Sequence, residues 1–231
     1  MTCCSAGIEQ GTFESLADHW QQILENSAEP TFFDSQTWQK TWWSEFGNDS
    51  ELQLIMVRSE SGEVNMIAPL MIDGSEISFL GSTDLVDYHD FLSRDRLSST
   101  CIQSLVSAVS QMSEIDTILL QSLPGNSPTI TQFREKAENA GWQVELEQED
   151  VAPRMDLPAS WDEYVSALRK KDRHELRRKL RRLEAVGEVN HVELSDPTDI
   201  ENSMADFIRL HRMSTPDKSA FMTPEREQFF C

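Results

Sequence analysis

Long apolar stretches are missing from this sequence of 231 residues. No run approaches the roughly 18 apolar residues that a membrane-spanning helix needs. The first ten residues have neither the basic start nor the apolar segment of a secretory signal. Because 39% of the residues are hydrophobic and 26% are charged, the composition is that of a globular protein. We therefore expect a soluble, cytoplasmic protein without a membrane span.

Cysteines and signature motifs are also scarce. The four cysteines, Cys3, Cys4, Cys101 and Cys231, have no CxxC or Cys/His spacing, so we expect free thiols in a reducing compartment and no metal site. The phosphate loops GxGxxG and GxxxxGKS/T are absent, as are the GxSxG and HExxH motifs. No catalytic residue is therefore identified by a motif.

Positive charge is rare in the first two thirds of the chain. Residues 1–150 hold 25 acids and 6 bases, a net charge of -19, whereas residues 151–231 hold 15 acids and 14 bases. Nine of those 14 bases fall between Arg169 and Arg182, where the only acids are Asp172 and Glu175. The first part should repel nucleic acid and anionic membranes, so any contact with a polyanion is expected to be local to this basic segment.

The first part of the chain has clear patterns for helices and strands. Apolar spacing and capping residues predict two helices, then a meander of strands, then helices alternating with strands. The expected helices cover 13–24, 35–46, 97–112 and 127–140, and the expected strands cover 52–58, 64–72, 76–80, 88–92, 117–121, 142–146 and 154–157. This order favours an α+β (mixed α/β) fold, in which a mixed sheet is flanked by helices.

A new unit is expected after Asp150. Ser160 and Glu163 have the spacing of a capping box, which predicts a helix starting at Trp161. Helices are expected over 161–186, over 197–213 and from Pro224, with a strand candidate over 188–194. One strand and several helices are too few elements to form a complete sheet domain. Either this tail packs onto the first domain, or the chain holds only the start of a second one.

The basic segment predicts an amphipathic helix. Leu176, Leu180 and Leu183 line one narrow apolar stripe. One basic row holds Arg173, Arg177 and Arg181 with Lys170 nearby, and a second row holds Lys171, Arg178 and Arg182. Like charges at i, i+4 cost about 0.2 to 0.5 kcal/mol per pair, which motivates a search for an anion.

The sequence leaves three alternatives open for what surrounds this basic helix. A nucleic-acid backbone is disfavoured, because the segment has no aromatic residue on which bases could stack. A phosphorylated cofactor or substrate suits the bidentate forks of arginine better. The helix can equally be solvated, or lie against the acidic surface of residues 1–150. His174 is most simply a residue of the polar face.

Two further groups are candidates for chemistry. The stretch from Asp84 to Asp90 gathers three carboxylates, Tyr88 and His89, but a strand here would put them on opposite faces, so a turn and strand are favoured over a metal site. His211 could be a catalytic or substrate-binding group, or a cation favoured at the end of a helix by the helix dipole.

Several short motifs, taken in order, resemble a known family. They cover the chain from about residue 31 to its end and comprise Phe33-Asp-Ser-Gln-Thr-Trp38 with Trp42-Trp43, Ile67-Ala-Pro-Leu70, Phe79-Leu-Gly-Ser82 with Asp87-Tyr88, Leu157-Pro-x-Ser160-Trp161, Lys171-x-Arg173-His-Glu-Leu-Arg177-Arg178-Lys179, and Leu210-His211 followed by Lys218-x-x-Phe221. Together they look like the CelD/BcsL-type acyltransferases of the GNAT superfamily, which are related to Fem-type aminoacyl transferases.

The resemblance implies a tandem pair of GNAT-like domains, the first at 12–157 and a partial second at 158–231 that begins with the basic helix. The family's second domain continues well past Phe230, and a glycine-rich pyrophosphate-binding turn of the (Arg/Gln)-x-x-Gly-x-(Gly/Ala) kind is missing here.

The resemblance also implies an activity, which is acyl transfer from acetyl-CoA or another acyl-CoA to an amine or hydroxyl, often in cell-envelope or exopolysaccharide pathways. The acceptor would be a small molecule, a saccharide or a peptide. No permanently bound cofactor is expected. Lys171, Arg173, Arg177 and Arg178 carry over as candidate anion contacts, and no catalytic base carries over. The alternative is an inactive binding module that docks an acidic or phosphorylated partner through the basic helix.

Overall fold

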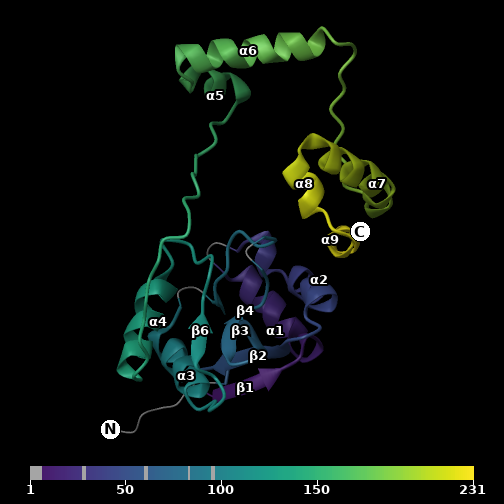
Figure 1. Cartoon of the computed structure of the whole chain (residues 1–231). Coiled ribbons are helices and arrows are strands. Elements are labelled where there is room, and N and C mark those ends of the chain that lie inside the picture. The colour runs from purple at the N-terminus through teal and green to yellow at the C-terminus, as the bar shows by residue number, and fades with distance from the viewer. Residues whose placement is uncertain (1–6, 28–29, 60–61, 83, 95–96) are drawn as a thin grey trace. The chain divides into compact units, whose positions relative to one another are not determined.

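The computed structural model describes residues 7–27, 30–59, 62–82, 84–94 and 97–231 (Figure 1). The chain forms two compact units. One unit combines the residues up to Glu147 with Arg212–Cys231, and the other is Gln148–His211. We call them the sheet unit and the helical unit and describe each by itself.

The sheet unit is built on a mixed sheet with the strand order β1-β2-β3-β4-β6 (Figure 1). Its strands are β1 (Gly7–Gly11), β2 (Glu51–Arg58), β3 (Val64–Asp73), β4 (Glu76–Phe79) and β6 (Thr117–Leu119), and the short β5 (Leu92–Ser93) pairs with β3. The first four strands are antiparallel neighbours, with Ile55 opposite Ala68 in the hairpin. β4 and β6 are parallel. The expected strands over 52–58, 64–72 and 76–80 are confirmed as β2, β3 and β4.

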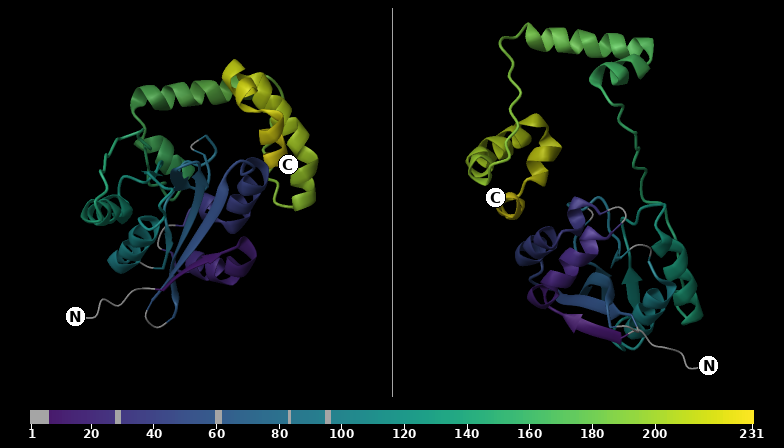
Figure 2. Two further views of the ribbon diagram at one scale, coloured as in Figure 1. Left: turned by 60° about the horizontal axis from the view of Figure 1, so that its bottom comes forward. Right: turned by 180° about the vertical axis from the view of Figure 1, so that it is seen from behind.

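Helices cover both faces of this sheet (Figures 1 and 2). α1 (Phe13–Glu25) and α2 (Gln36–Phe46), with the 3-10 turn Phe32–Asp34 between them, pack on one face. α3 (Ser99–Val109) and α4 (Pro128–Asn139) pack on the other. All four predicted helices are confirmed. Ser35 and Ser127 cap α2 and α4, each accepting a hydrogen bond from a backbone N–H of the first turn.

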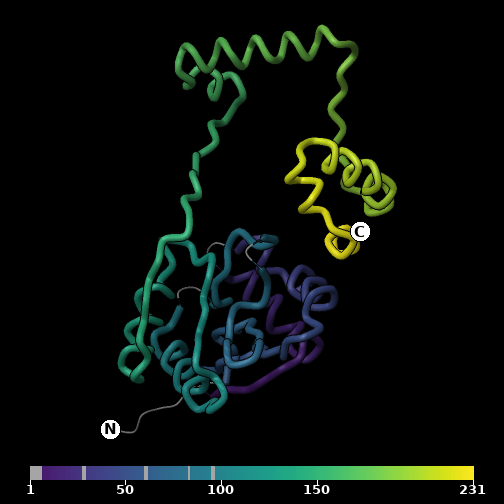
Figure 3. The backbone as a smooth tube through the Cα atoms, in the orientation of Figure 1, coloured from purple at the N-terminus to yellow at the C-terminus, as the bar shows by residue number. Residues whose placement is uncertain are grey.

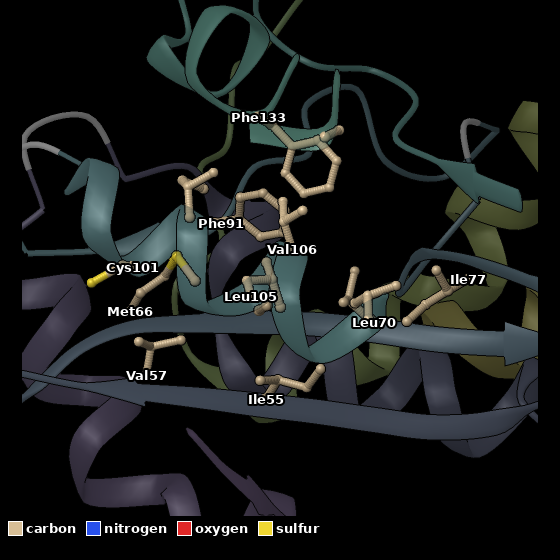
Figure 4. Close-up of a cluster of buried hydrophobic side chains, with 14 of the residues drawn as sticks. Ile55, Val57, Met66, Leu70, Ile77, Phe91, Cys101, Leu105, Val106 and Phe133 are labelled. Atoms are coloured by element: carbon tan, nitrogen blue, oxygen red, sulfur yellow. The ribbon is translucent and has the colours of Figure 1, made fainter. Parts of the chain in front are cut away.

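The alternation of side chains along the strands divides the core into two clusters. Ile55, Val57, Met66 and Leu70 face α3, which contributes Cys101, Leu105 and Val106 (Figure 4). Leu54, Met56 and Ile67 face α1, where Trp20 is fully buried. Because both of its faces are buried, β3 is apolar almost throughout, unlike a strand with one face in water.

The C-terminal helices α8 (Pro216–Phe221) and α9 (Pro224–Phe230) belong to the sheet unit. The ring of Phe229 is buried and lies 4.8 Å from the Trp38 ring and 5.6 Å from the Phe46 ring, both on α2. Arg226 donates to Asp84 at 2.7 Å. For residues 212–231 the tail therefore packs onto the first part of the chain.

The helical unit contains α5 (Trp161–Ala167), α6 (Lys170–Glu184) and α7 (Pro197–Ser214) up to His211. The predicted cap is confirmed, since the Ser160 hydroxyl accepts from the Glu163 N–H at 3.2 Å. The expected helix over 161–186 is interrupted at Leu168, whose backbone is extended. Residues 185–196 run between α6 and α7 as an irregular connection (Figure 3).

Four predicted strands were wrong. Of residues 88–92, only Leu92 joins a ladder, and 142–146, 154–157 and 188–194 form no strand. Trp142 and Val144 pack against the hydrophobic cluster that includes α3. The alternation of apolar and polar residues over 142–146 therefore reflects a half-buried segment, and this segment pairs with no neighbouring strand. Conversely, β1 was not expected, because Gly7–Gly11 has little apolar alternation. The fold class is nevertheless α+β, as expected, with a mostly antiparallel sheet flanked by helices.

Candidate functional site

The basic segment forms the 15-residue helix α6, composed almost wholly of the strong helix formers Lys, Arg, Glu and Leu. α6 starts after Arg169 and is followed by Gly187, whose φ of 156° suits glycine. The Arg173 guanidinium donates to the Ser166 carbonyl of α5 at 2.9 Å, which ties the two helices together.

The four candidate anion contacts lie on α6 but differ in their partners. Arg178 forms a bidentate ion pair with Glu175, with N–O distances of 3.0 and 2.6 Å. This hydrogen bonding lowers the pKa of Glu175 and raises that of Arg178. Arg173 donates to Ser166, whereas Lys171 and Arg177 have no ion pair or hydrogen bond in the part of the chain that the structure describes. Lys171 and Arg177 are therefore the more available cations.

The leucine stripe of α6 is also exposed. Leu180 is 40% and Leu183 51% exposed, and no residue of α6 is buried. The helix thus presents both a charged and an apolar surface.

His211 lies near the end of α7, and its ring centroid is 5.9 Å from that of Phe207 on the same helix. The structure brings the four cations together on α6, whereas His211 belongs to a different helix.

The residues from Asp84 to Asp90 do not converge on a metal. Asp84 binds Arg226, whereas Asp90 accepts from the hydroxyls of Ser127 and Thr129 at 2.5 Å each and from the Phe91 N–H at 2.8 Å. Among the described residues, no group of three or more His, Cys, Asp or Glu could hold a metal ion. Asp90 instead anchors the start of α4.

Two partly buried carboxyls, those of Asp34 and Asp90, were not singled out from the sequence for their electrostatics. Burial raises the pKa of Asp90 even though three donors oppose this shift. Burial also raises the pKa of Asp34, against hydrogen bonds from Thr31 and with a further contribution from the charge of Asp90. The signal for Asp34 was the Thr31-x-x-Asp34 spacing of a capping box, which the structure contains.

His89 is buried and its ring stacks on Phe79 at a centroid distance of 5.4 Å. Gly81, with φ of 132°, permits this contact, because a Cβ at this position would lie 2.7 Å from His89 Nε2. The backbone N–H of His89 donates to the Ser122 carbonyl at 3.0 Å. These contacts fix the segment after β4 in place.

Cys101 and Cys231 are free thiols, and burial raises the pKa of Cys101. Cys3 and Cys4 lie outside the described residues. No helix in the described ranges combines the length and apolarity that crossing a membrane requires.

Residues 170–231 match a family model described as an acetyltransferase (GNAT) domain. The match covers 62 of the 231 residues, starts at the first residue of α6 and includes His211 and α9. Neither the curated proteins nor the solved structures contain a match to this chain. The family match supports the GNAT superfamily for this segment and, with it, acyl transfer as the general chemistry.

Proposed function

We propose that this protein is a CelD/BcsL-like acyltransferase, related to the Fem-type enzymes, that moves an acyl group from acetyl-CoA or another acyl-CoA to an amine or hydroxyl. The observation that carries the proposal is the GNAT match starting at α6, the helix that holds eight of the nine bases between Arg169 and Arg182. The proposed acceptor is a small molecule, saccharide or peptide in a cytoplasmic step of cell-envelope or exopolysaccharide synthesis.

The residues of α6 suit the phosphates of a CoA substrate. Lys171 and Arg177 are exposed cations without a described protein acceptor, so they can bind phosphate without breaking another contact. Arg173 and Arg178 would have to share or leave Ser166 and Glu175. Lys171 and Arg177 are therefore assigned the main contacts, and Arg173 and Arg178 supporting ones.

A base must remove a proton from the acceptor during acyl transfer. His211 is the candidate on the matched segment, with its imidazole beside Phe207.

We propose a domain order in which residues 12–157 form a first GNAT-like domain and residues 158–231 contribute to a second one.

Calorimetry with acetyl-CoA and CoA tests the proposal directly. Arg177→Ala and Lys171→Ala should each weaken CoA binding about tenfold, as expected for loss of a hydrogen bond to a charged group. Lys179→Ala is the matched control, since it removes the same charge from the same helix outside both basic rows. No CoA binding by the intact protein up to about 1 mM would refute the donor assignment.

One observation favours a second candidate function. Lys171 and Arg177 are exposed cations without a described protein acceptor, which also suits a GNAT-like module that binds an acidic or phosphorylated partner without catalysis. In that case the protein would bind phosphopeptides with the same dependence on Arg177 while showing no affinity for CoA.

A further inference from the structure

α6 combines two exposed features that a solvated helix does not need. Helices in proteins are stabilised mainly by burying an apolar stripe, yet Leu180 and Leu183 remain 40% and 51% exposed. The neighbouring apolar residues are exposed as well, with Val186 86% and Trp161 57% exposed. The helical unit offers α6 little cover, because its only buried hydrophobic residues in the described ranges are Val165 and Ile208.

Cations flank this stripe on both sides. By helical spacing, Arg173 and Arg177 lie on one side of the leucines and Lys179 lies on the other. Asp172 and Glu184 also border the stripe, but the bases of the helix outnumber its acids by eight to three. The Arg178–Glu175 ion pair lies away from the stripe, so covering the leucines leaves it intact. Long Arg and Lys side chains can hold their charges at a polar surface while the adjacent leucines are buried.

The two features together favour one kind of surface. A nucleic acid would use the cations but not the leucines, and α6 has no aromatic residue for base stacking. A bilayer with anionic headgroups uses both, because apolar side chains enter the interface and each nearby cation adds about 1 kcal/mol of attraction. An apolar stripe that enters the bilayer interface, with cations along its edges, is typical of an interfacial helix.

We propose that α6 docks on an anionic phospholipid surface, with Leu176, Leu180 and Leu183 in the interface and Arg173, Arg177 and Lys179 at the headgroups. This inference goes beyond acyl transfer. It would hold the protein at a membrane surface through this helix. It depends on α6 alone and stands or falls independently of CoA binding.

Cosedimentation of the intact protein with vesicles tests the inference, using phosphatidylcholine alone or with about 30 mol% phosphatidylserine. Binding is expected only to the anionic vesicles and should fall strongly between about 0.05 and 0.5 M NaCl. Leu180→Gln with Leu183→Gln keeps the charge and the helix propensity, and should weaken vesicle binding at least about tenfold. The same variant should bind CoA like the unchanged protein.

A pair of charge reversals tests the orientation of the helix. Arg177→Glu with Lys179→Glu changes the cations beside the leucines, and Lys171→Glu with Arg181→Glu makes the same net change on the side of the helix away from them. The first pair should lose at least about tenfold in binding and the second only about threefold. Equal losses from the two pairs, no loss from the leucine variant, or no binding to anionic vesicles would overturn the proposal. If duplex DNA displaces the vesicles equally well from the unchanged protein and from the leucine variant, α6 binds polyanions in general and the proposal is overturned.

Discussion

The two units reach their structure by different means. The sheet unit buries side chains on both faces of its sheet, in two clusters that include Trp20 and Phe229. The helical unit has only Val165 and Ile208 buried among its described hydrophobic residues, and depends on caps and local pairs such as Ser160–Glu163 and Arg178–Glu175. Local contacts of this kind contribute tenths of a kcal/mol to about 1 kcal/mol each, whereas a buried aromatic ring contributes several. Stability should therefore be concentrated in the sheet unit.

The largest expected effect comes from the tryptophan in the core of the sheet unit. Trp20 is fully buried and donates from Nε1 to the Asp34 carbonyl at 2.8 Å. Trp20→Ala should lower the free energy of unfolding by about 4 kcal/mol, measured by urea denaturation. Trp161→Ala, at a residue that is 57% exposed in the helical unit, should cost less than about 0.5 kcal/mol. Similar losses in the free energy of unfolding from both variants would contradict the predicted difference in stability between the two units.

Phe229 tests whether the C-terminal residues share the core of the sheet unit. Phe229→Ala should cost about 3 kcal/mol, because it removes a buried ring that contacts Trp38 and Phe46. The control Phe207→Ala, on a side chain that is 47% exposed, should change the free energy of unfolding by less than about 1 kcal/mol. If the two variants unfold at the same urea concentration, α9 is not part of that core.

Gly81 gives a smaller and more local test. Gly81→Ala should cost about 2 kcal/mol, because a Cβ would clash with His89 and the φ of 132° is strained for alanine. Gly125→Ala meets nothing within 4 Å and should be nearly neutral. A stable Gly81→Ala variant, seen in the same urea titration, would mean that His89 is not held where the structure places it.

The partly buried carboxyls of Asp34 and Asp90 predict a pH dependence of stability in the sheet unit. Burial raises the pKa of Asp90 above its ordinary value of 3.8, so the folded state binds the proton more tightly than the unfolded state. The resulting stability is present below pH 3.8 and is lost as the pH rises through the raised pKa. Asp90→Asn should flatten this fall in urea titrations at several pH values. Asp87→Asn, at an exposed residue, should leave the fall unchanged.

Short-range signals in the sequence predicted much of the fold. Ser35, Ser127 and Ser160 marked helix starts because a cap acts on N–H groups two or three residues away. The apolar, β-rich runs of β2 and β3, separated by a short polar turn, marked neighbouring strands for the same reason.

Long-range contacts were not predictable in this way. Residues 142–146 and 188–194 have strand-like alternation, but whether a strand forms depends on a free neighbouring strand that no local pattern reports. Asp90 meets Ser127 across 37 residues, and Arg226 meets Asp84 across 142. The candidate site was more accessible to sequence reasoning, because the rows of α6 follow from helical spacing alone.

Native-state hydrogen exchange tests the difference between the units most directly. We predict slow exchange for the amides of β2, β3 and α3 and equally for those of α9, with fast exchange in α5 and α6. The protected part of the tail should thus begin after residue 211, where the sheet unit resumes. Equal protection in α6 and β3, or an α9 that exchanges as fast as α6, would contradict the account.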